Sequence, residues 1–355
     1  RSIHTLDAGS SFVDFNRAGI PLMELVTEPV IKNSKEAGEF ARELQLLLRT
    51  LGVSNANMEK GEMRVEANVS VSKTDSFGTK VEVKNINSFK AVEKAIDYEI
   101  KRQISVLESG GTIKQETRGW NEDKEETFSQ RSKEEAADYR YFPDPDLPKL
   151  KISEIPEFSV SVLQAEMPLL PSEIREKYSK FGLHQKDIQV LLVDRQLGDL
   201  FEQVAEVLVG SRDEKKKIKL AVNYMLNNLL SLQDSLDHHV TLNISSEAFV
   251  RVIEETYEGK ISSNSAVEIL EKLATTHHSI DELETFITEK QQSSDENEIS
   301  SLVEQVLSEN MQAVDEYKSG KEAAMKFLVG QGMRLSSGSV NPGILQKILL
   351  NKLSE

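Results

Sequence analysis

The stretch that decides the fold is MRVEANVSVSKTDSFGTKVEVKNIN, residues 63–87. From Met63 to Ser72 apolar and polar residues alternate without interruption, and the alternation resumes over residues 80–84. A period of two is typical of a strand with one buried face. Between the two runs lies TDSFG, residues 74–78, which has the composition of a turn. The sequence therefore predicts a β-hairpin.

This hairpin would collect polar side chains on one of its faces: Arg64, Glu66, Asn68, Glu82 and Lys84. Mixed charges of this kind are ordinary on the solvent side of an antiparallel sheet. Two carboxylates, an amide and flanking cations are also the groups that a Mg²⁺–phosphate site requires. The spacing leaves both interpretations open, the solvated face and the metal site.

Composition narrows the class of protein. The 355 residues are 38% hydrophobic and 29% charged, with a mean hydropathy of −0.40, which fits two or three soluble domains. No apolar run is as long as a membrane span. The absence of cysteine excludes disulfides, thiolate metal sites and a cysteine nucleophile. A net charge of −16 argues against wrapping nucleic acid with the whole surface but permits a local basic patch.

Helical periodicity flanks the hairpin on both sides. Ser34 is predicted to cap a helix that runs to Leu51 and is closed by Gly52. A second amphipathic helix is predicted from Phe89 to a stop at Gly110.

Shorter strands are predicted before and after these elements. A strand over residues 12–17 is followed by an apolar one over residues 20–26, and residues 112–118 form a later one. The apolar run contains Glu24, and a carboxylate there is costly unless it is paired or bound to a metal, or faces water at an edge.

Helical patterns alone continue from about residue 159 to the C-terminus, past a polar stretch at 291–298 that reads as a linker. We therefore expect an α+β protein with three parts: a sheet domain over 1–158, a helical domain over 159–290 and a small helical tail over 295–355.

Several long segments carry a resemblance to a known family: FVDFNRAGIPLMELVTEPVI (12–31), MRVEANVSV (63–71), TKVEVKNINSFKAVEKAIDYEI (79–100), QETRGWNEDKEETFSQRSKEEAADYRYFPDPDLP (115–148) and FLVGQGMR (327–334). Together the chain resembles the B subunit of the tRNA-dependent aspartyl/glutamyl amidotransferase, whose C-terminal part is a YqeY-like domain. The resemblance implies an antiparallel-sheet cradle similar to the glutamine synthetase fold, followed by helical domains.

The resemblance also implies an activity. The family works with an amidase A subunit, which releases ammonia from glutamine, and a small C subunit. Misacylated tRNA is bound by the B subunit, which uses ATP and Mg²⁺ to phosphorylate the side-chain carboxylate of Glu-tRNA(Gln) or Asp-tRNA(Asn), and ammonia then displaces phosphate. The implied location is a bacterial cytoplasm or the matrix or stroma of an organelle. A non-catalytic tRNA-binding adaptor for an amidase is the alternative.

By resemblance, Glu24, Glu66 and Glu82 match the catalytic, metal-binding carboxylates of the family, although Glu66 stands where the family usually has Asp. A further set would contact phosphates or hold the carboxylates: Arg64, Asn68, Lys84 and Asn87.

Two other groups of residues take roles from the resemblance. Tyr139 and Arg140 would lie near the mouth of the ammonia channel or the reaction chamber, and Lys321, Lys326 and Arg334 would bind tRNA. The family's N-terminal Gly-Leu-Glu-x-His motif and an acidic segment preceding Ser2 are absent. We therefore expect an N-terminally truncated chain that lacks some metal-site residues.

Overall fold

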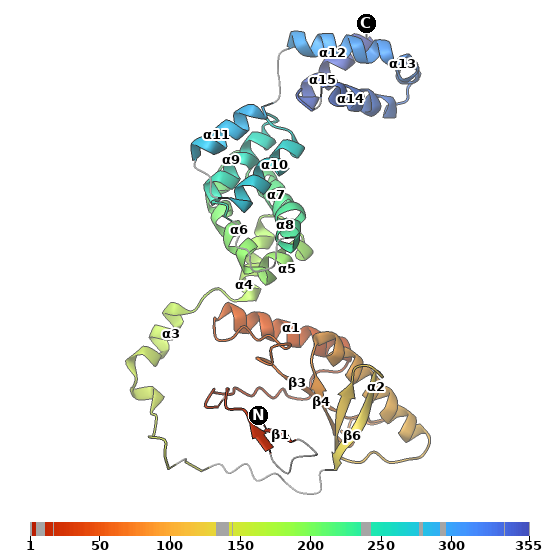
Figure 1. The fold of residues 1–355 in the computed structure, drawn as a ribbon. Helices are drawn as coiled ribbons and strands as arrows, with labels where there is room; N and C mark the ends of the chain where they lie inside the picture. Colours follow the sequence, from red (N-terminus) through yellow and green to blue (C-terminus); the bar gives the residue numbers. More distant parts are fainter. Residues whose placement is uncertain are drawn as a thin grey trace. The chain divides into compact units, whose positions relative to one another are not determined.

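The structure is a computed structural model, and it describes residues 2–4, 11–16, 18–132, 142–143, 145–235, 243–276, 280–291, 296–336 and 338–354. The chain separates into two compact units, Arg1–Glu166 and Met167–Glu355. The first combines strands with helices and the second is built of helices (Figure 1). The predicted α+β class is therefore confirmed, while the domain boundaries near residues 158 and 290 stay predictions.

The first unit contains a sheet of four strands in the order β3-β4-β5-β6. Their bounds are Val65–Val69, Val81–Ile86, Glu116–Asn121 and Glu126–Ser132. β3 pairs antiparallel with β4, which confirms the predicted hairpin, and β5 pairs antiparallel with β6. β4 and β5 run parallel, so the sheet is mixed rather than antiparallel throughout. Parallel neighbours need a crossover connection, and the helix α2, Phe89–Glu108, lies within it.

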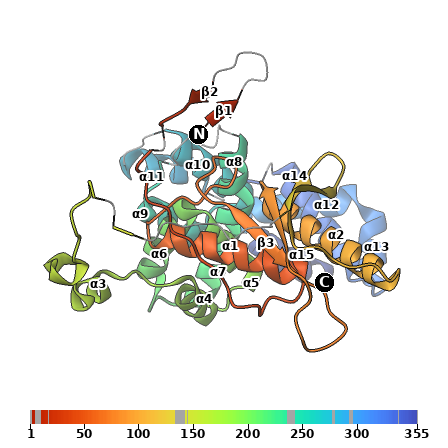
Figure 2. The same cartoon turned by 90° about the horizontal axis from the view of Figure 1, so that it is seen from below.

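The two faces of the hairpin differ as the alternation predicts. Its apolar side chains are buried in the core of the unit: Val69, Val81, Val83 and Ile86. Its polar side chains are exposed or half-buried: Glu66, Asn68, Glu82 and Lys84. Buried residues of α2, among them Val92 and Ile96, share the apolar core with the strands, and α2 lies alongside the sheet in both ribbon views (Figures 1 and 2). The polar face is thus the face turned away from α2.

The helices α1 and α2, on either side of the hairpin in sequence, each begin with a side-chain cap. The helix α1, Ser34–Thr50, is capped by Asn33 and not by Ser34, because the Asn33 side chain accepts a 2.9 Å hydrogen bond from the amide of Glu36. A capping residue has extended backbone, and Asn33 has φ −149° and ψ 166°. Ser88 caps α2 in the same way through the amide of Ala91, at 3.1 Å.

The N-terminal residues form less regular structure than predicted. β1, Ser2–His4, pairs with β2, Ser11–Val13, but no strand forms over residues 20–26, and Leu22 is 90% exposed. A strand is held by hydrogen bonds to a neighbour, and no described segment pairs with this one. The strand predicted over residues 112–118 begins only at Glu116.

Short turns and helices connect the sheet to the second unit. Two 3₁₀ turns, Ile152–Glu154 and Pro156–Phe158, precede the helix α3, Val160–Glu166. None of the described helices is long and apolar enough to cross a membrane.

The larger core of the second unit is formed by the helices α4 to α11 (Figure 1). Their bounds are Pro171–Lys180, Gln185–Val193, Arg195–Leu208, Glu214–Tyr224, Leu230–Ser235, Ser246–Tyr257, Ser263–Thr275 and Ile280–Glu289, with a π-helical turn, Met225–Leu229, between α7 and α8. Pro171 occupies the first turn of α4, where the missing backbone N–H of proline costs no hydrogen bond. Asp194 separates α5 from α6 and caps α6 by accepting a 2.9 Å hydrogen bond from the amide of Leu197.

The C-terminal helices have a core of their own. They are α12, α13, α14 and α15, with the bounds Glu296–Glu309, Met311–Lys318, Ala323–Leu335 and Pro342–Ser354. Leu328 of α14 and Leu345 and Leu349 of α15 are fully buried in this core. The helix α12 begins inside the stretch predicted as a linker, of which residues 292–295 lie outside the described residues.

Candidate functional site

The polar face of the hairpin brings two carboxylates together around one ammonium group. The Nζ atom of Lys84 lies 3.2 Å from Oε2 of Glu66 and 3.4 Å from Oε1 of Glu82. Asn68 pairs with Glu82 across the two strands, so the two side chains are neighbours on the same face. Four of the predicted site residues therefore lie together on β3 and β4.

A β-bulge aligns these groups. Val65 pairs with Ile86 and Ala67 pairs with Val83, so Glu66 stands opposite two residues of β4, Lys84 and Asn85. Asn85 accommodates the extra residue with a left-handed backbone, at φ 62°. Bulges redirect side chains and are frequent beside active sites, and here the bulge lies at the Glu66–Lys84 ion pair.

β5 supplies Thr117, which the sequence pattern does not mark as a site residue. Thr117 pairs with Glu82 in the parallel register, and its Oγ1 atom donates a 2.9 Å hydrogen bond to Oε2 of Glu82. Because Lys84 lies near the other oxygen, Oε1, both oxygens of Glu82 have protein partners. The strand pattern over residues 112–118 was the available signal, but it does not say that β5 lies next to β4.

The charge of Lys84 is stabilised in this arrangement. Burial on its own would lower the pKa of Lys84, but the hydrogen bonds and negative charges of Glu66 and Glu82 outweigh burial and leave the pKa raised above its usual range. Lys84 is therefore protonated at neutral pH, and it offsets part of the repulsion between the two carboxylates.

A buried polar network supports the sheet from the other side. Glu99 of α2 is fully buried and accepts hydrogen bonds from Arg102 at 2.6 and 2.9 Å, from Gln103 at 2.8 Å and from Thr127 at 3.1 Å. Gln103 also donates to the carbonyl of Val69, at 3.1 Å, at the end of β3. Fully satisfied networks of this kind fix one geometry, so α2 holds the strands that carry the polar face.

Arg64 and Asn87 lie at one end of the hairpin. Arg64 precedes the first residue of β3, Asn87 follows the last residue of β4, and Val65 and Ile86, their neighbours in sequence, are paired. Both side chains are exposed. They flank the group around Lys84 without a hydrogen bond to it among the described residues.

Glu24 is not brought into this group. It is exposed in the segment without regular secondary structure. Among the described residues, no three histidine, aspartate or glutamate side chains are grouped so that they could hold a metal ion. The assignment of Glu24 as a metal ligand stays a prediction. Tyr139 and Arg140, the predicted channel residues, lie outside the described residues.

The three cations predicted to bind tRNA lie on or near α14. Lys321 forms an exposed ion pair with Glu316, at 3.5 Å. Lys326 and Arg334 are exposed on α14 itself, and neither forms an ion pair with any residue that the structure describes. These two side chains are thus available to an external anion.

Comparison with known proteins identifies the family of this chain. Residues 1–156 match the family model described as the GatB/GatE catalytic domain, and residues 199–353 match the model described as the GatB domain. The first match contains the whole hairpin and β5, and the second contains α14.

Individual relatives agree with these matches. The chain is 39% identical over 354 residues to the chloroplastic/mitochondrial B subunit of the glutamyl-tRNA(Gln) amidotransferase of Physcomitrium patens; the match covers 98% of this chain and 60% of the relative. It is 38% identical over 360 residues to the B subunit of the aspartyl/glutamyl-tRNA(Asn/Gln) amidotransferase of Thioalkalivibrio sulfidiphilus, covering 99% of this chain and 73% of the relative. The corresponding protein of Rickettsia bellii is 39% identical over 360 residues, covering 99% of this chain and 71% of the relative. The chain belongs to the family of tRNA-dependent amidotransferase B subunits.

Proposed function

We propose that this chain is the part of an amidotransferase B subunit that activates the side-chain carboxylate of a misacylated tRNA. The substrate would be Glu-tRNA(Gln), Asp-tRNA(Asn) or both, and the activation would be an ATP- and Mg²⁺-dependent phosphorylation followed by amidation with ammonia. The observation that carries the proposal is the pair of carboxylates, Glu66 and Glu82, held around Lys84 within the region that matches the catalytic-domain family.

Elementary chemistry favours this division of labour. A carboxylate is a poor acyl donor because an oxide-like oxygen would have to leave, whereas phosphate is a good leaving group. Bringing ATP to a carboxylate places anions side by side, and bound Mg²⁺ would offset that repulsion. Lys84 supplies a further fixed positive charge on the same face.

The donor set fits Mg²⁺ in its chemistry. The carboxylates of Glu66 and Glu82 and the amide oxygen of Asn68 are hard oxygen ligands, and Mg²⁺ is commonly bound through one or two carboxylates together with water and phosphate oxygens. Glu66 and Glu82 would therefore hold the ion, and Thr117 would keep the carboxylate of Glu82 in position. Glu24 is proposed as a further ligand on the resemblance alone.

The other predicted site residues and the three predicted domains have proposed roles as well. Arg64, Lys84 and Asn87 would contact phosphates at the end of the hairpin, and Tyr139 and Arg140 would lie near the entry of ammonia. Residues 1–158 would form the activating domain, 159–290 a helical domain, and 295–355 the tRNA-binding tail.

The relatives' names support the proposed partners. They describe subunits of amidotransferases that act on glutamyl- or aspartyl-tRNA. We therefore propose an amidase A subunit and a small C subunit as partners. The relatives come from bacteria and from a chloroplast or mitochondrion, which makes a bacterial cytoplasm or an organellar matrix or stroma the proposed location.

The decisive experiment replaces Glu82 with Gln in the full-length protein assembled with its A and C partners. Formation of Gln-tRNA(Gln) from Glu-tRNA(Gln), ATP, glutamine and Mg²⁺ should be abolished, while glutaminase activity of the A subunit persists. Glu59→Gln, an exposed acid in the same unit, is the matched control and should retain activity. Amidation at the parent rate in the Glu82 variant would refute the metal assignment.

A non-catalytic tRNA adaptor is the second candidate, and the absence of a three-acid cluster among the described residues favours it. An adaptor would bind misacylated tRNA, yet the Glu82 substitution would leave ATP-dependent amidation by the assembled complex unchanged.

A further inference from the structure

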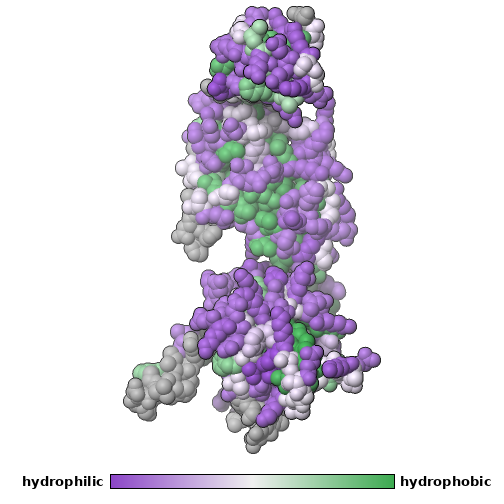
Figure 3. Space-filling view, turned by 90° about the vertical axis from the view of Figure 1, so that its right-hand side faces the viewer, coloured by the Kyte–Doolittle hydropathy of each residue, from purple (hydrophilic) through white to green (hydrophobic). Residues whose placement is uncertain are grey.

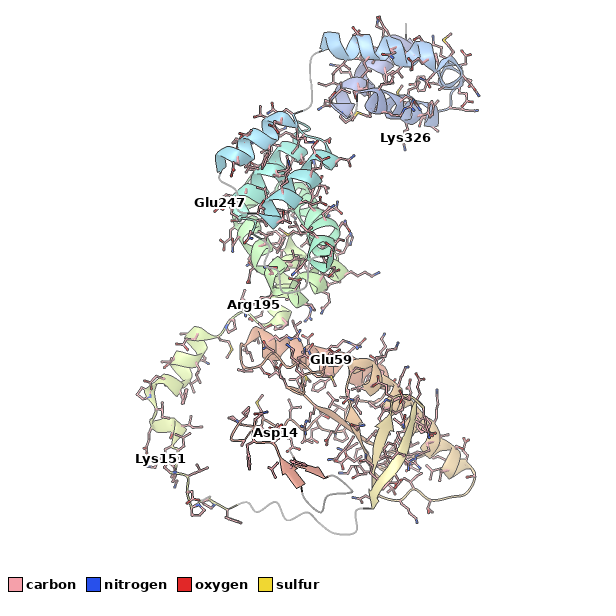
Figure 4. All side chains as sticks on the ribbon, viewed as in Figure 1. Asp14, Glu59, Lys151, Arg195, Glu247 and Lys326 are labelled. Carbon is pink, nitrogen blue, oxygen red and sulfur yellow. The ribbon has the colours of Figure 1, made fainter. Side chains whose placement is uncertain are left out.

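The outward face of α14 combines an aromatic ring, two cations and an open glycine. Lys326, Phe327, Gly330 and Arg334 are all exposed, and their spacing of three and four residues places them on one side of the helix. Figure 4 labels Lys326 on α14, at the edge of the C-terminal helices away from α12. Figure 3 shows mostly hydrophilic residues, with a few hydrophobic ones between them, on the visible face of these helices.

Phe327 departs from the pattern of its own helix. The neighbouring apolar residues Met325 and Leu328 are buried in the core of the C-terminal helices, whereas Phe327 is 49% exposed. No other aromatic ring packs against it among the described residues. A single exposed aromatic residue is common on protein surfaces. Exposure alone therefore does not indicate that Phe327 binds a ligand, and the neighbouring residues supply the evidence.

Two glycines of α14, Gly330 and Gly332, differ in the space around them. A Cβ atom at Gly332 would lie 2.7 Å from Cδ2 of the buried Leu345, so close packing accounts for that glycine. A Cβ atom at Gly330 would meet nothing within 4 Å. A glycine inside a helix costs about 1 kcal/mol relative to alanine, and packing within the chain gives no reason for the one at position 330. It leaves the backbone open to close approach by a ligand.

The charge of this region points to an anion. Residues 323–355 contain four cations, Lys326, Arg334, Lys347 and Lys352, and one acidic side chain, Glu355, in a chain of net charge −16. Of these, Lys352 is paired with Glu304 at 2.9 Å. Lys326 and Arg334, which flank Phe327 on the outward face, have no such partner within the described part of the chain.

We propose that this face binds RNA at an unpaired nucleotide, whose base stacks on Phe327 while Lys326 and Arg334 contact the adjoining phosphates and the strand passes over Gly330. The inference rests on the proposed tRNA-binding role of the C-terminal helices and adds a recognised feature, a base that is not stacked within a duplex. Aromatic stacking of single-stranded bases and phosphate contacts from cations are the two general sources of such binding. A membrane-surface helix would need a broader apolar face than Phe327 and the 37% exposed Leu335 give α14.

The two kinds of contact respond differently to salt, which makes the proposal testable in the full chain with a tRNA(Gln) transcript as the probe. Phe327→Ala should weaken binding about tenfold and leave the salt dependence unchanged, and Phe327→Tyr should restore affinity. Lys326→Gln and Arg334→Gln should each weaken binding and reduce the slope of log K against log salt concentration by about 0.7 to 0.9. Leu350→Ala, at a 37% exposed position on α15, is the matched control and should have no effect.

A fluorescence readout reports stacking directly. The only tryptophan of the chain, Trp120, is 2% exposed, so Phe327→Trp adds an exposed indole. Its emission should be quenched by the transcript and not by a fully paired RNA duplex of equal length.

The outcomes separate this inference from the proposed function. If the two cation variants weaken binding but Phe327→Ala does not, the stacking site is refuted and the tRNA-binding role stands. The inference is also refuted if the chain binds the paired duplex as tightly as the transcript. It is refuted as well if the chain binds vesicles of anionic phospholipid in a Phe327-dependent manner and does not bind the transcript. If none of these variants changes affinity for the transcript, the tRNA-binding role assigned to α14 fails as well.

Discussion

Thr117 Oγ1 donates a 2.9 Å hydrogen bond to Oε2 of Glu82, joining two parallel strands that are separated in sequence by the whole of α2. Lys84 approaches the other oxygen of the same carboxylate. The orientation of Glu82 is thus fixed by a neutral donor on one oxygen and a cation on the other.

Replacing Thr117 with valine should therefore lower kcat for amidation in the assembled enzyme. A hydrogen bond to a charged group contributes about 1.5–3 kcal/mol, so a loss of roughly tenfold or more is expected if Glu82 must be held in place. Thr117→Ser keeps the hydroxyl and should restore activity. The KM for tRNA should stay constant in both variants, because Thr117 has no proposed contact with tRNA, and a change confined to KM would contradict the positioning role.

Replacing the buried Glu99 with glutamine should destabilise the first unit. Glu99→Gln removes the negative charge that faces Arg102 and, at 3.6 Å, Arg118. Breaking a buried ion pair by removing one partner costs about 3–5 kcal/mol, so urea unfolding of the first unit should show a loss of about 3 kcal/mol.

Glu93→Gln on the same helix is the matched control for Glu99. Glu93 pairs with Arg42 at 2.7 Å, but both side chains are about one third to one half exposed, and exposed pairs contribute about 0–1 kcal/mol. If Glu99→Gln and Glu93→Gln lowered the free energy of unfolding equally, burial would not explain the contribution of Glu99.

The sequence predicts those parts of the site that depend on contacts between residues close together in the chain. The hairpin of β3 and β4 follows from alternation and a turn within 25 residues, and the shared face of Glu66, Asn68, Glu82 and Lys84 follows from it. The parallel pairing of β4 with β5 depends on a crossover through α2, and the local pattern does not specify that neighbour. Thr117 was missed for this reason.

Residues 20–26 illustrate the opposite case. Their apolar run predicts a strand, but a strand requires a partner for its backbone groups, and these residues have no strand partner within the described part of the chain. The position of Glu24 relative to the other carboxylates therefore could not be predicted from its own segment.

The start of α1 allows a direct test of capping. Asn33→Ala removes the acceptor for the Glu36 amide and should cost about 1 kcal/mol, measured by thermal or urea unfolding. Ser34→Ala lies inside the first turn and should change stability by a few tenths of a kcal/mol at most. The reverse order of effects would reinstate Ser34 as the cap.

The acid stability of the first unit should depend on Glu116. Burial would raise the pKa of Glu116, but hydrogen bonds from Ser129 and Arg118 and the positive charges of Arg118 and Arg102 outweigh it and leave the pKa below its ordinary value of 4.5. A carboxylate whose pKa is lowered by folding contributes stability that is fully present above its unfolded pKa and is lost as the pH falls through the folded pKa. The free energy of unfolding should therefore decrease below about pH 4.5, and Glu116→Gln should remove part of that decrease while already being less stable at pH 7. Urea unfolding of both proteins from pH 7 to pH 3 measures the difference, and parallel curves for the two would contradict the role of Glu116.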